Sequence, residues 1–218
     1  MTQAFPTVLA LLASLITAPL PDDYDLPALL QQRKLTSFNR VASAQVSAGK
    51  RGIRLDERAG EGIVWLNDVA FSSGTIEIDV RGQDVLQRSF IGIAFHAADD
   101  STYDAVYFRP FNFLAKDSVR AIHAVQYISH PDWTWKRLRD ERNAQYEKAV
   151  RNPPDPNGWF HARIEVTSTD VRVFVEGDAT PALTVKKIST RDSGKLGLWV
   201  GDGSGGEFAN LRITRAVR

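Results

Sequence analysis

Short runs of alternating apolar and polar residues fill the chain from Ile53 onward. Side chains two apart on an extended strand share a face, so this period of two predicts β-strands. Gly, Asp, Asn or Ser separates the runs, as expected for turns, and no long helical period competes. The pattern predicts strands over 42–48, 53–56, 62–65, 74–81, 90–97, 103–112, 119–127, 159–167, 170–176, 182–186, 195–200 and 207–215.

Many short strands with almost no helix are typical of an antiparallel sandwich. We therefore expect an all-β fold over residues 41–218, an antiparallel two-sheet jelly-roll sandwich with one short helical insertion. The insertion, residues 130–158, is too long for a hairpin loop. Within it, residues 136–150 have helical propensity and near-alternating charge, and Asp132 or Thr134 is a suitable N-cap.

The alternation also sorts side chains by strand face. In the run 91–96, Gly, Ala and His alternate with large apolar residues, and in 103–112 Tyr107 and Arg109 lie opposite Val106 and Phe108. In 159–166, Trp, His, Arg and Glu alternate with an apolar row. A face of small, aromatic and cationic residues suggests the floor of a ligand groove. The alternative is a solvated sheet face whose His and Arg are held by cross-strand partners.

The long apolar run Phe5–Ala18 is too short to span about 30 Å of hydrocarbon as a helix, so no membrane span is expected. We predict a signal peptide over 1–20 and a secreted or periplasmic protein, although no positive charge precedes the run and Pro19 follows it. An N-terminal helix packed on the domain and a misassigned start codon are the alternatives. Residues 21–40, rich in Pro and Asp, are predicted to form a linker or N-terminal extension.

The charge balance excludes some partners. With 27 basic and 26 acidic residues, the chain has a formal charge of +1, which does not favour nucleic acid or an anionic membrane. The chain has no cysteine, which excludes disulfides, thiolate zinc sites and cysteine nucleophiles. The oligomeric state is left open.

Familiar catalytic and cofactor motifs are absent. The chain has no phosphate-binding glycine loop, nucleophile elbow or His-Glu-x-x-His sequence, and GDGSGG at 201–206 is predicted to be a hairpin turn. We expect no cofactor and no metal. Calcium is a weak alternative, because Asp99 with Asp100, or Asp202 with Glu207, offers carboxylate oxygens that more often bind backbone amides.

Four segments carry a family resemblance: GTIEIDVRG, FIGIAFHAADDSTYDAVYFRPFNF, WFHARIEVTSTDVRVFVEG and GKLGLWVGDGSGGEFANLRI. Their order and spacing, from about Ile53 to Arg215, resemble the concanavalin A-like lectin/glucanase superfamily, and most of all its laminin-G-like and 3-keto-disaccharide hydrolase domains. The resemblance implies two curved sheets that hold a saccharide on the concave face or at one rim. It implies activity less well, because the superfamily mixes hydrolases, lyases and binding modules.

Glu77 and Asp79 in GTIEIDV resemble the start of the Glu-x-Asp-x-x-Glu strand of family-16 glycoside hydrolases. The second Glu of that motif is replaced here by Gly82, so a retaining mechanism on this strand would lack its acid/base. We therefore expect these carboxylates to be outward-facing polar residues. Ala209 also stands where these families often have Asp before Asn, which weakens an inherited calcium site.

The first function hypothesis is a secreted carbohydrate-binding domain that recognises a neutral glycan on its concave face. Aromatic rings would stack on sugar rings and polar groups would fix hydroxyls. The predicted ligand-binding residues are Tyr107, Arg109, Asn112, Gln126, Tyr127, His130, Trp133, Trp135, Trp159 and Arg163.

Two alternatives stay open. The first is a glycoside-cleaving enzyme of the hydrolase or keto-glycoside lyase type, in which a His acts as general base and an Arg stabilises an oxyanion. Its weak catalytic candidates are His96, His130, His161, Arg109 and Arg163. The second is a protein-interaction or adhesion module, which would carry an exposed apolar patch away from any groove.

Overall fold

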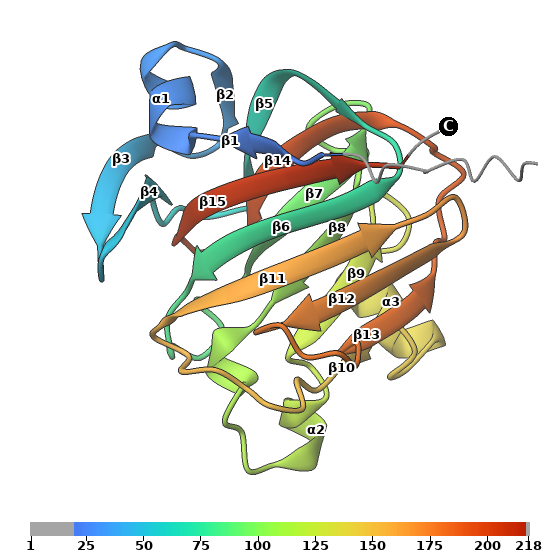
Figure 1. Cartoon of the computed structure of the whole chain (residues 1–218). Coiled ribbons are helices and arrows are strands. Elements are labelled where there is room, and N and C mark those ends of the chain that lie inside the picture. Colours follow the sequence, from blue (N-terminus) through green and yellow to red (C-terminus); the bar gives the residue numbers. More distant parts are fainter. Residues whose placement is uncertain (1–19, 217–218) are drawn as a thin grey trace, which may run out of the picture.

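The computed structural model of the chain describes residues 20–216 as two antiparallel β-sheets stacked face to face (Figure 1). This confirms the predicted all-β two-sheet sandwich. The predicted signal peptide lies almost wholly outside the described residues. Within those residues, no helix is long and apolar enough to cross a membrane.

The eight-stranded sheet has the order β13-β12-β11-β6-β15-β4-β3, and β1 pairs with β15 outside this path. Its strands are β1 (Asp22–Tyr24), β3 (Ala42–Ser47), β4 (Lys50–Leu55), β6 (Gly74–Arg81), β11 (Trp159–Val166), β12 (Asp170–Val175), β13 (Leu183–Lys186) and β15 (Gly206–Arg215).

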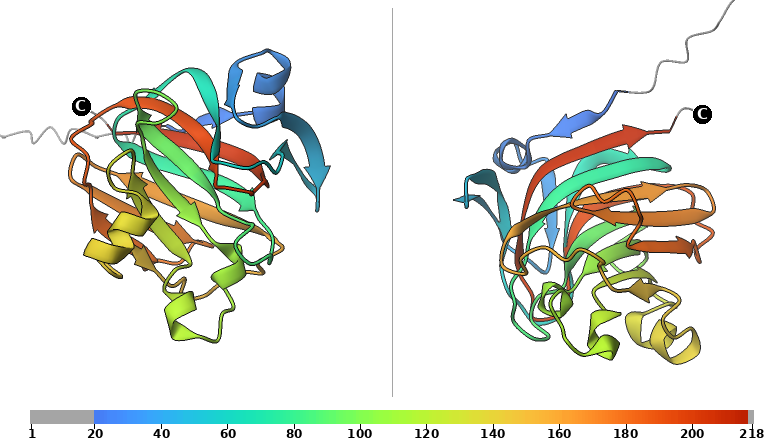
Figure 2. Two further views of the ribbon diagram at one scale, coloured as in Figure 1. Left: turned by 180° about the vertical axis from the view of Figure 1, so that it is seen from behind. Right: turned by 60° about the horizontal axis from the view of Figure 1, so that its bottom comes forward.

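The seven-stranded sheet has the order β10-β9-β8-β7-β14-β5-β2. Its strands are β2 (Leu35–Phe38), β5 (Gly62–Phe71), β7 (Ile91–Ala97), β8 (Asp104–Phe108), β9 (Val125–Ser129), β10 (Glu147–Lys148) and β14 (Gly194–Val200). The short helices are α1 (Leu26–Gln31), the 3-10 turn η1 (Pro110–Asn112), α2 (Ser118–Ala121) and α3 (Trp135–Glu141). Both α2 and α3 lie at the lower end of the sandwich in Figure 1 and in both views of Figure 2.

The core lies between the two sheets, where the apolar side chains of one sheet pack against those of the other. On β6, Ile76, Ile78 and Val80 are buried, and the polar residues between them point away from the core. On β11 the burial alternates strictly, with Phe160 and Ile164 inward. The period of two therefore assigned the faces of these strands correctly.

Residues 21–40, which the sequence analysis treats as a linker or extension, enter both sheets. Strand β1 pairs with β15, and β2 pairs with β5 at the edge of the other sheet. Between them, the Asp25 side chain accepts a hydrogen bond from the Ala28 amide and caps α1, which buries Leu26 and Pro27. Three-residue and four-residue edge strands give too few positions for alternation to be visible.

Two other boundaries differ from the prediction. The strand expected over 119–127 begins only at Val125, because the Asp117 side chain accepts a hydrogen bond from the Arg120 amide and caps α2. The helix expected over 136–150 ends at Glu141, although Thr134 caps it as foreseen. The chain then forms β10 on the edge of β9, where Glu147 is buried.

Arg40 ties three loops together at one end of the sandwich. Its guanidinium is buried and donates to the carbonyls of Gly60 at 2.7 Å and Gly201 at 2.8 Å. Longer hydrogen bonds reach the carbonyls of Arg58 and Ser204. These acceptors lie in the β4–β5 and β14–β15 connections, so one side chain fixes both loops against the N-terminal segment.

We expect Arg40→Ala to destabilise the protein by about 3 kcal/mol, because buried carbonyls lose a charged donor. For a chain of this length, the melting temperature should fall by about 6 to 12 °C. Differential scanning calorimetry measures this, and Arg151→Ala, an exposed arginine between β10 and β11, is the matched control. Equal melting temperatures for the two variants would refute the role of Arg40.

Candidate functional site: a pocket on the seven-stranded sheet

A pocket of about 510 Å³ is hollowed into the outer face of the seven-stranded sheet, which is turned away from the other sheet. Its floor comes from residues that lie opposite one another in the ladder: Tyr107 pairs with Gln126 and Gly92, and Gly92 pairs with Trp199. Any side chain at Gly92 would collide with the backbone of β8. Gly92 thus allows β7 to lie close to β8 beneath the aromatic rings.

A buried arginine organises the floor of the pocket. Arg109 follows β8 and is only 4% exposed. Its guanidinium donates to the Tyr107 hydroxyl at 2.6 Å, to the His123 carbonyl at 2.8 Å and to Gln126 Oε1. The Tyr107 hydroxyl in turn donates to Gln126 Oε1 at 2.7 Å. The charge is therefore held in one orientation by side chains of adjacent strands.

Glu147 supplies the countercharge from the insertion. It is 2% exposed, and its carboxylate lies 3.5 Å from Arg109 Nη1 and 3.0 Å from Arg139 Nη2. Strand β10 places Glu147 directly opposite Gln126, and α3 carries Arg139. A buried carboxylate between two guanidinium groups avoids the cost of an unpaired buried charge. The same contacts attach the insertion to the sheet.

His123 lies at the wall of the pocket beside this carboxylate. Its Nδ1 is 2.7 Å from Glu147 Oε2. Burial lowers the pKa of His123 below its ordinary value, although the charge of Glu147 opposes this shift. A pKa below the ordinary value leaves the ring mostly neutral near pH 7, and Nδ1 is in close contact with the Glu147 carboxylate without a hydrogen bond of good geometry to it.

Aromatic side chains form the rest of the wall. Phe90 packs edge-to-face against both Tyr107 and Phe111, and Tyr107 contacts Trp199 with ring centroids 4.8 Å apart. Trp135, at the start of α3, is 45% exposed and has the Arg139 guanidinium 5.1 Å from its ring centroid. An exposed indole beside a pocket gives a flat apolar surface to a ligand.

Four of the sequence-predicted ligand-binding residues line this pocket together: Tyr107, Arg109, Asn112 and Trp135. Gln126 lies directly behind them, bonded to Arg109. His130 stacks on Tyr103 with ring centroids 5.0 Å apart. The Tyr103 hydroxyl donates to Glu61, which lines the far end of the pocket.

The other predicted residues lie elsewhere. Tyr127 is on the core side of β9, and its hydroxyl accepts a hydrogen bond from the Ile188 amide. Trp133 has the guanidinium groups of Arg137 and Arg142 each 4.2 Å from its ring centroid, which fixes it in the α3 region. His96 is fully buried beside Phe71 and Phe95. Trp159, His161 and Arg163 are on the outer face of the eight-stranded sheet, the opposite side of the molecule.

Several residues that line the pocket are not among those predicted from the sequence. Trp199 had the clearest signal, because GLW in 197–199 alternates like the Gly-Ala-His row of β7. His123 and Arg120 gave no such signal, since they lie in a connection that was read as a strand. The lining residues not selected are Glu61, Leu86, Gln87, Phe90, Phe111, Arg120, His123, Arg139, Trp199, Gly201 and Asp202.

The carboxylates considered for calcium bind protein groups instead. Asp100 accepts from the Trp65 indole at 2.6 Å, and Asp202 accepts from the Gly60 amide at 2.6 Å. Glu207 accepts from Gln45 and lies 3.4 Å from Arg81. Among residues 20–216, no three His, Cys, Asp or Glu side chains are grouped so that they could hold a metal ion.

Comparison with solved structures identifies the architecture. The chain is similar to carbohydrate binding module CBM66 from Bacillus subtilis, with a TM-score of 0.57 and 16% identity over 83% of this chain and 95% of that one. It is also similar to the Bacillus licheniformis β-glucanase, with a TM-score of 0.53 and 13% identity over 92% and 100% of the two chains. The fold is that of the concanavalin A-like lectins and glucanases.

A third concanavalin A-like neighbour is the VIP36 exoplasmic/lumenal domain in its Ca2+/Man3GlcNAc-bound form, with a TM-score of 0.53 and 11% identity over 86% of each chain. No family model and no curated protein matches the sequence. At these identities the likeness extends to the fold alone, and the closer resemblance to laminin-G-like domains stays a prediction.

The pair formed by His123 and Glu147 gives a pH prediction. We expect the pKa of His123 to lie below the ordinary value for histidine, because burial disfavours the charged ring. In Glu147→Gln the pKa should fall further, since the carboxylate that favours the imidazolium is lost. NMR titration of the imidazole resonances measures both values. Glu141→Gln, an exposed carboxylate on α3, is the control, and a rise of the His123 pKa in Glu147→Gln would contradict the contact.

Proposed function

We propose that this domain binds a neutral saccharide in the pocket lined by Tyr107, Arg109 and Trp135. The observation that carries the proposal is the combination of an exposed indole with a rigid, buried array of polar groups in one pocket. Ligand pockets are commonly lined by apolar and aromatic side chains with a few fixed polar groups that set orientation. The similarity in fold to a carbohydrate binding module and to a saccharide-bound lectin domain supports the same proposal.

Trp135 is the stacking platform in this proposal. Its ring is held from one side by the Arg139 guanidinium, and Arg139 is itself fixed by two hydrogen bonds to Glu147. The indole therefore keeps its orientation without a ligand, which reduces the entropy lost on binding. The carbon-bound hydrogens of a pyranose ring suit such a surface.

Polar groups at both ends of the pocket would bind the hydroxyls. Arg120 is exposed and donates to the Phe111 carbonyl at 3.0 Å, which leaves other guanidinium hydrogens for a ligand. Glu61 and Asp202 offer carboxylate oxygens at the other end. A mixture of donors and acceptors of both charges suits an uncharged, hydroxyl-rich ligand. We also propose that the protein is secreted. This part of the proposal is based on the apolar run at residues 5–18, which lies outside the described residues.

Trp135→Ala should weaken saccharide binding about tenfold, the loss expected when one aromatic stacking contact is removed. Isothermal titration calorimetry with the tightest ligand from a panel of neutral hexasaccharides (cellohexaose, xylohexaose, laminarihexaose and mannohexaose) measures the effect. Phe38→Ala, an exposed aromatic on edge strand β2 that does not line the pocket, is the matched control. Equal affinities for Trp135→Ala and the parent protein would refute the assignment.

One observation favours a second candidate function, glycoside cleavage at the same pocket. A neutral His123 oriented by a buried carboxylate resembles the arrangement of a general base, and Arg109 and Arg120 lie in the same lining. In this reading, His123 Nε2 takes a proton from a bound sugar or water. His123 takes the place of the sequence-predicted histidines here, while Arg109, which is among the sequence-predicted catalytic candidates, lines the same pocket.

His123→Gln separates the two functions. If the domain is only a binding module, the variant changes affinity by a small factor and neither protein releases reducing or keto sugar from glycosides. If the domain is an enzyme, product forms with the parent protein, and its rate falls at least about 100-fold in the variant. Product release measured by chromatography decides between them, and an unchanged rate in His123→Gln would exclude His123 as the base.

A further inference from the structure

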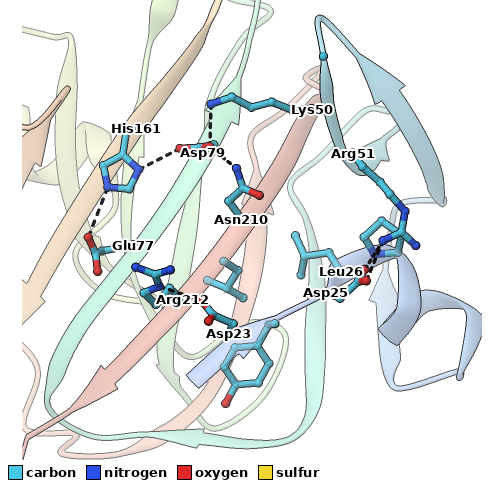
Figure 3. A pocket seen from close by; sticks show the side chains of 14 residues that line it. Asp23, Asp25, Leu26, Lys50, Arg51, Glu77, Asp79, His161, Asn210 and Arg212 are labelled. Carbon is cyan, nitrogen blue, oxygen red and sulfur yellow. Dashed lines mark hydrogen bonds and ion pairs between the residues drawn. The ribbon is translucent and has the colours of Figure 1, made fainter. Parts of the chain in front are cut away.

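A second polar pocket of about 690 Å³ lies on the opposite side of the molecule, on the outer face of the eight-stranded sheet. Figure 3 shows the side chains that line it. Strands β6, β11 and β15 supply its floor and one wall. The segment from β1 to α1 and the turn between β3 and β4 supply the other walls. Five separate parts of the chain therefore enclose a volume within the range of small-molecule sites.

Asp79 is the fixed centre of this pocket. It is 6% exposed and accepts from Lys50 at 2.7 Å, from Asn210 at 2.6 Å and from His161 Nδ1 at 2.9 Å. Burial alone would raise the pKa of Asp79, but these three donors outweigh it and lower the pKa to about 2. The carboxylate is thus ionised and its hydrogen bonds are made within the protein. It holds the side chains of Lys50, Asn210 and His161 in place.

Asn210 reaches Asp79 because β15 is irregular there. The register of β15 against β6 shifts between Ala209 and Arg212, and Asn210 has a φ of 52°. Asn tolerates this left-handed conformation better than most residues. The bulge moves Asn210 out of the regular ladder and directs its amide to Asp79 (Figure 3).

The side chains of His161 and Glu77 can each form a further hydrogen bond to a ligand. With Nδ1 bound to Asp79, the His161 Nε2 faces Glu77 Oε1 at 3.5 Å, too long for a strong hydrogen bond. Glu77 forms no other ion pair among residues 20–216. One ligand oxygen about 2.8 Å from both atoms would accept from the Nε2–H of a protonated His161 ring and donate to the Glu77 carboxylate. A hydroxyl group has this dual character, whereas an anion or an ammonium ion does not.

The charge of the lining also favours an uncharged ligand. Asp23 pairs with Arg212 at 2.8 Å and Asp25 pairs with Arg51 at 2.7 Å, while Lys50 neutralises Asp79. The hydrogen bond to Asp79 raises the pKa of His161, and the charge of Glu77 adds to this shift, so the ring can balance Glu77. The pocket offers hydrogen-bond donors and acceptors with little net charge.

We propose that this pocket is a second saccharide-binding site, in which His161 and Glu77 together bind one sugar hydroxyl and Lys50 and Arg212 offer donors to its neighbours. The proposal does not depend on the first site, because the two pockets share no residue and lie on opposite outer faces. A domain with both sites would bind two saccharide molecules, or two parts of one polysaccharide, at the same time.

NMR titration of the labelled full chain with the same four neutral hexasaccharides tests the proposal. We expect amide shifts at Glu77, Asp79, His161 and Asn210 that saturate independently of those around Trp135. Glu77→Ala should weaken the saccharide affinity measured from the shifts of Asp79, His161 and Asn210 at least tenfold. The affinity measured from the shifts around Trp135 should stay unchanged. Glu165→Ala, another outward carboxylate in the eight-stranded sheet but outside the pocket, is the matched control.

The two sites fail separately in this experiment. Saturable shifts around Trp135 with none at the four eight-stranded-sheet residues would overturn the second site and leave the first intact. Shifts at those four residues that persist in Glu77→Ala with unchanged affinity would also overturn it. The reverse pattern, with binding at Glu77 and none around Trp135, would refute the first site and support the second. If Glu77→Ala does not fold, Glu77→Gln replaces it, because the neutral amide removes the charge that faces His161 and is a weaker acceptor for the ligand hydroxyl than the carboxylate is.

Discussion

The burial of the Arg109 charge is the constraint on which the first pocket depends. A guanidinium inside a sheet of apolar residues is costly unless each donor has a partner. Tyr107 and Gln126 provide neutral partners from the same and the adjacent strand, and Glu147 provides the countercharge. Glu147 can do so only if the chain leaves α3 and pairs with β9. The need to satisfy one charge therefore fixes the insertion, and with it the position of Trp135.

Alternation along the chain predicted which side of each strand is polar, and the burial patterns of β6 and β11 confirm this. On β8 every residue is buried, but Phe108 packs against Phe160 of the other sheet and Tyr107 lines the outer pocket, as predicted. It did not predict which sheet each strand joins. Tyr107 and Arg163 both occupy polar faces, but β8 and β11 belong to different sheets, so the two side chains point to opposite sides of the molecule. A period of two contains no information about strand order, which depends on long-range pairing.

Three features of the site were beyond a pattern-based prediction. Glu147 lies in a charged segment that favours a helix locally, and its buried pairing with Arg109 overrides that preference. His123 follows α2, whose cap at Asp117 is a single side-chain contact. The β1–α1 segment that walls the second pocket reads as a linker because its strands are very short. Long-range contacts decide the structure around Glu147 and of the β1–α1 segment, whereas α2 depends on one local cap.

The most direct test of the central claim is a crystal structure of the protein with the hexasaccharide that binds most tightly. We expect sugar density in the pocket on the seven-stranded sheet, with one pyranose ring stacked on Trp135 and hydroxyls within hydrogen-bonding distance of Arg120 or Asn112. A fully occupied saccharide elsewhere, with this pocket accessible in the crystal and holding only solvent, would contradict it.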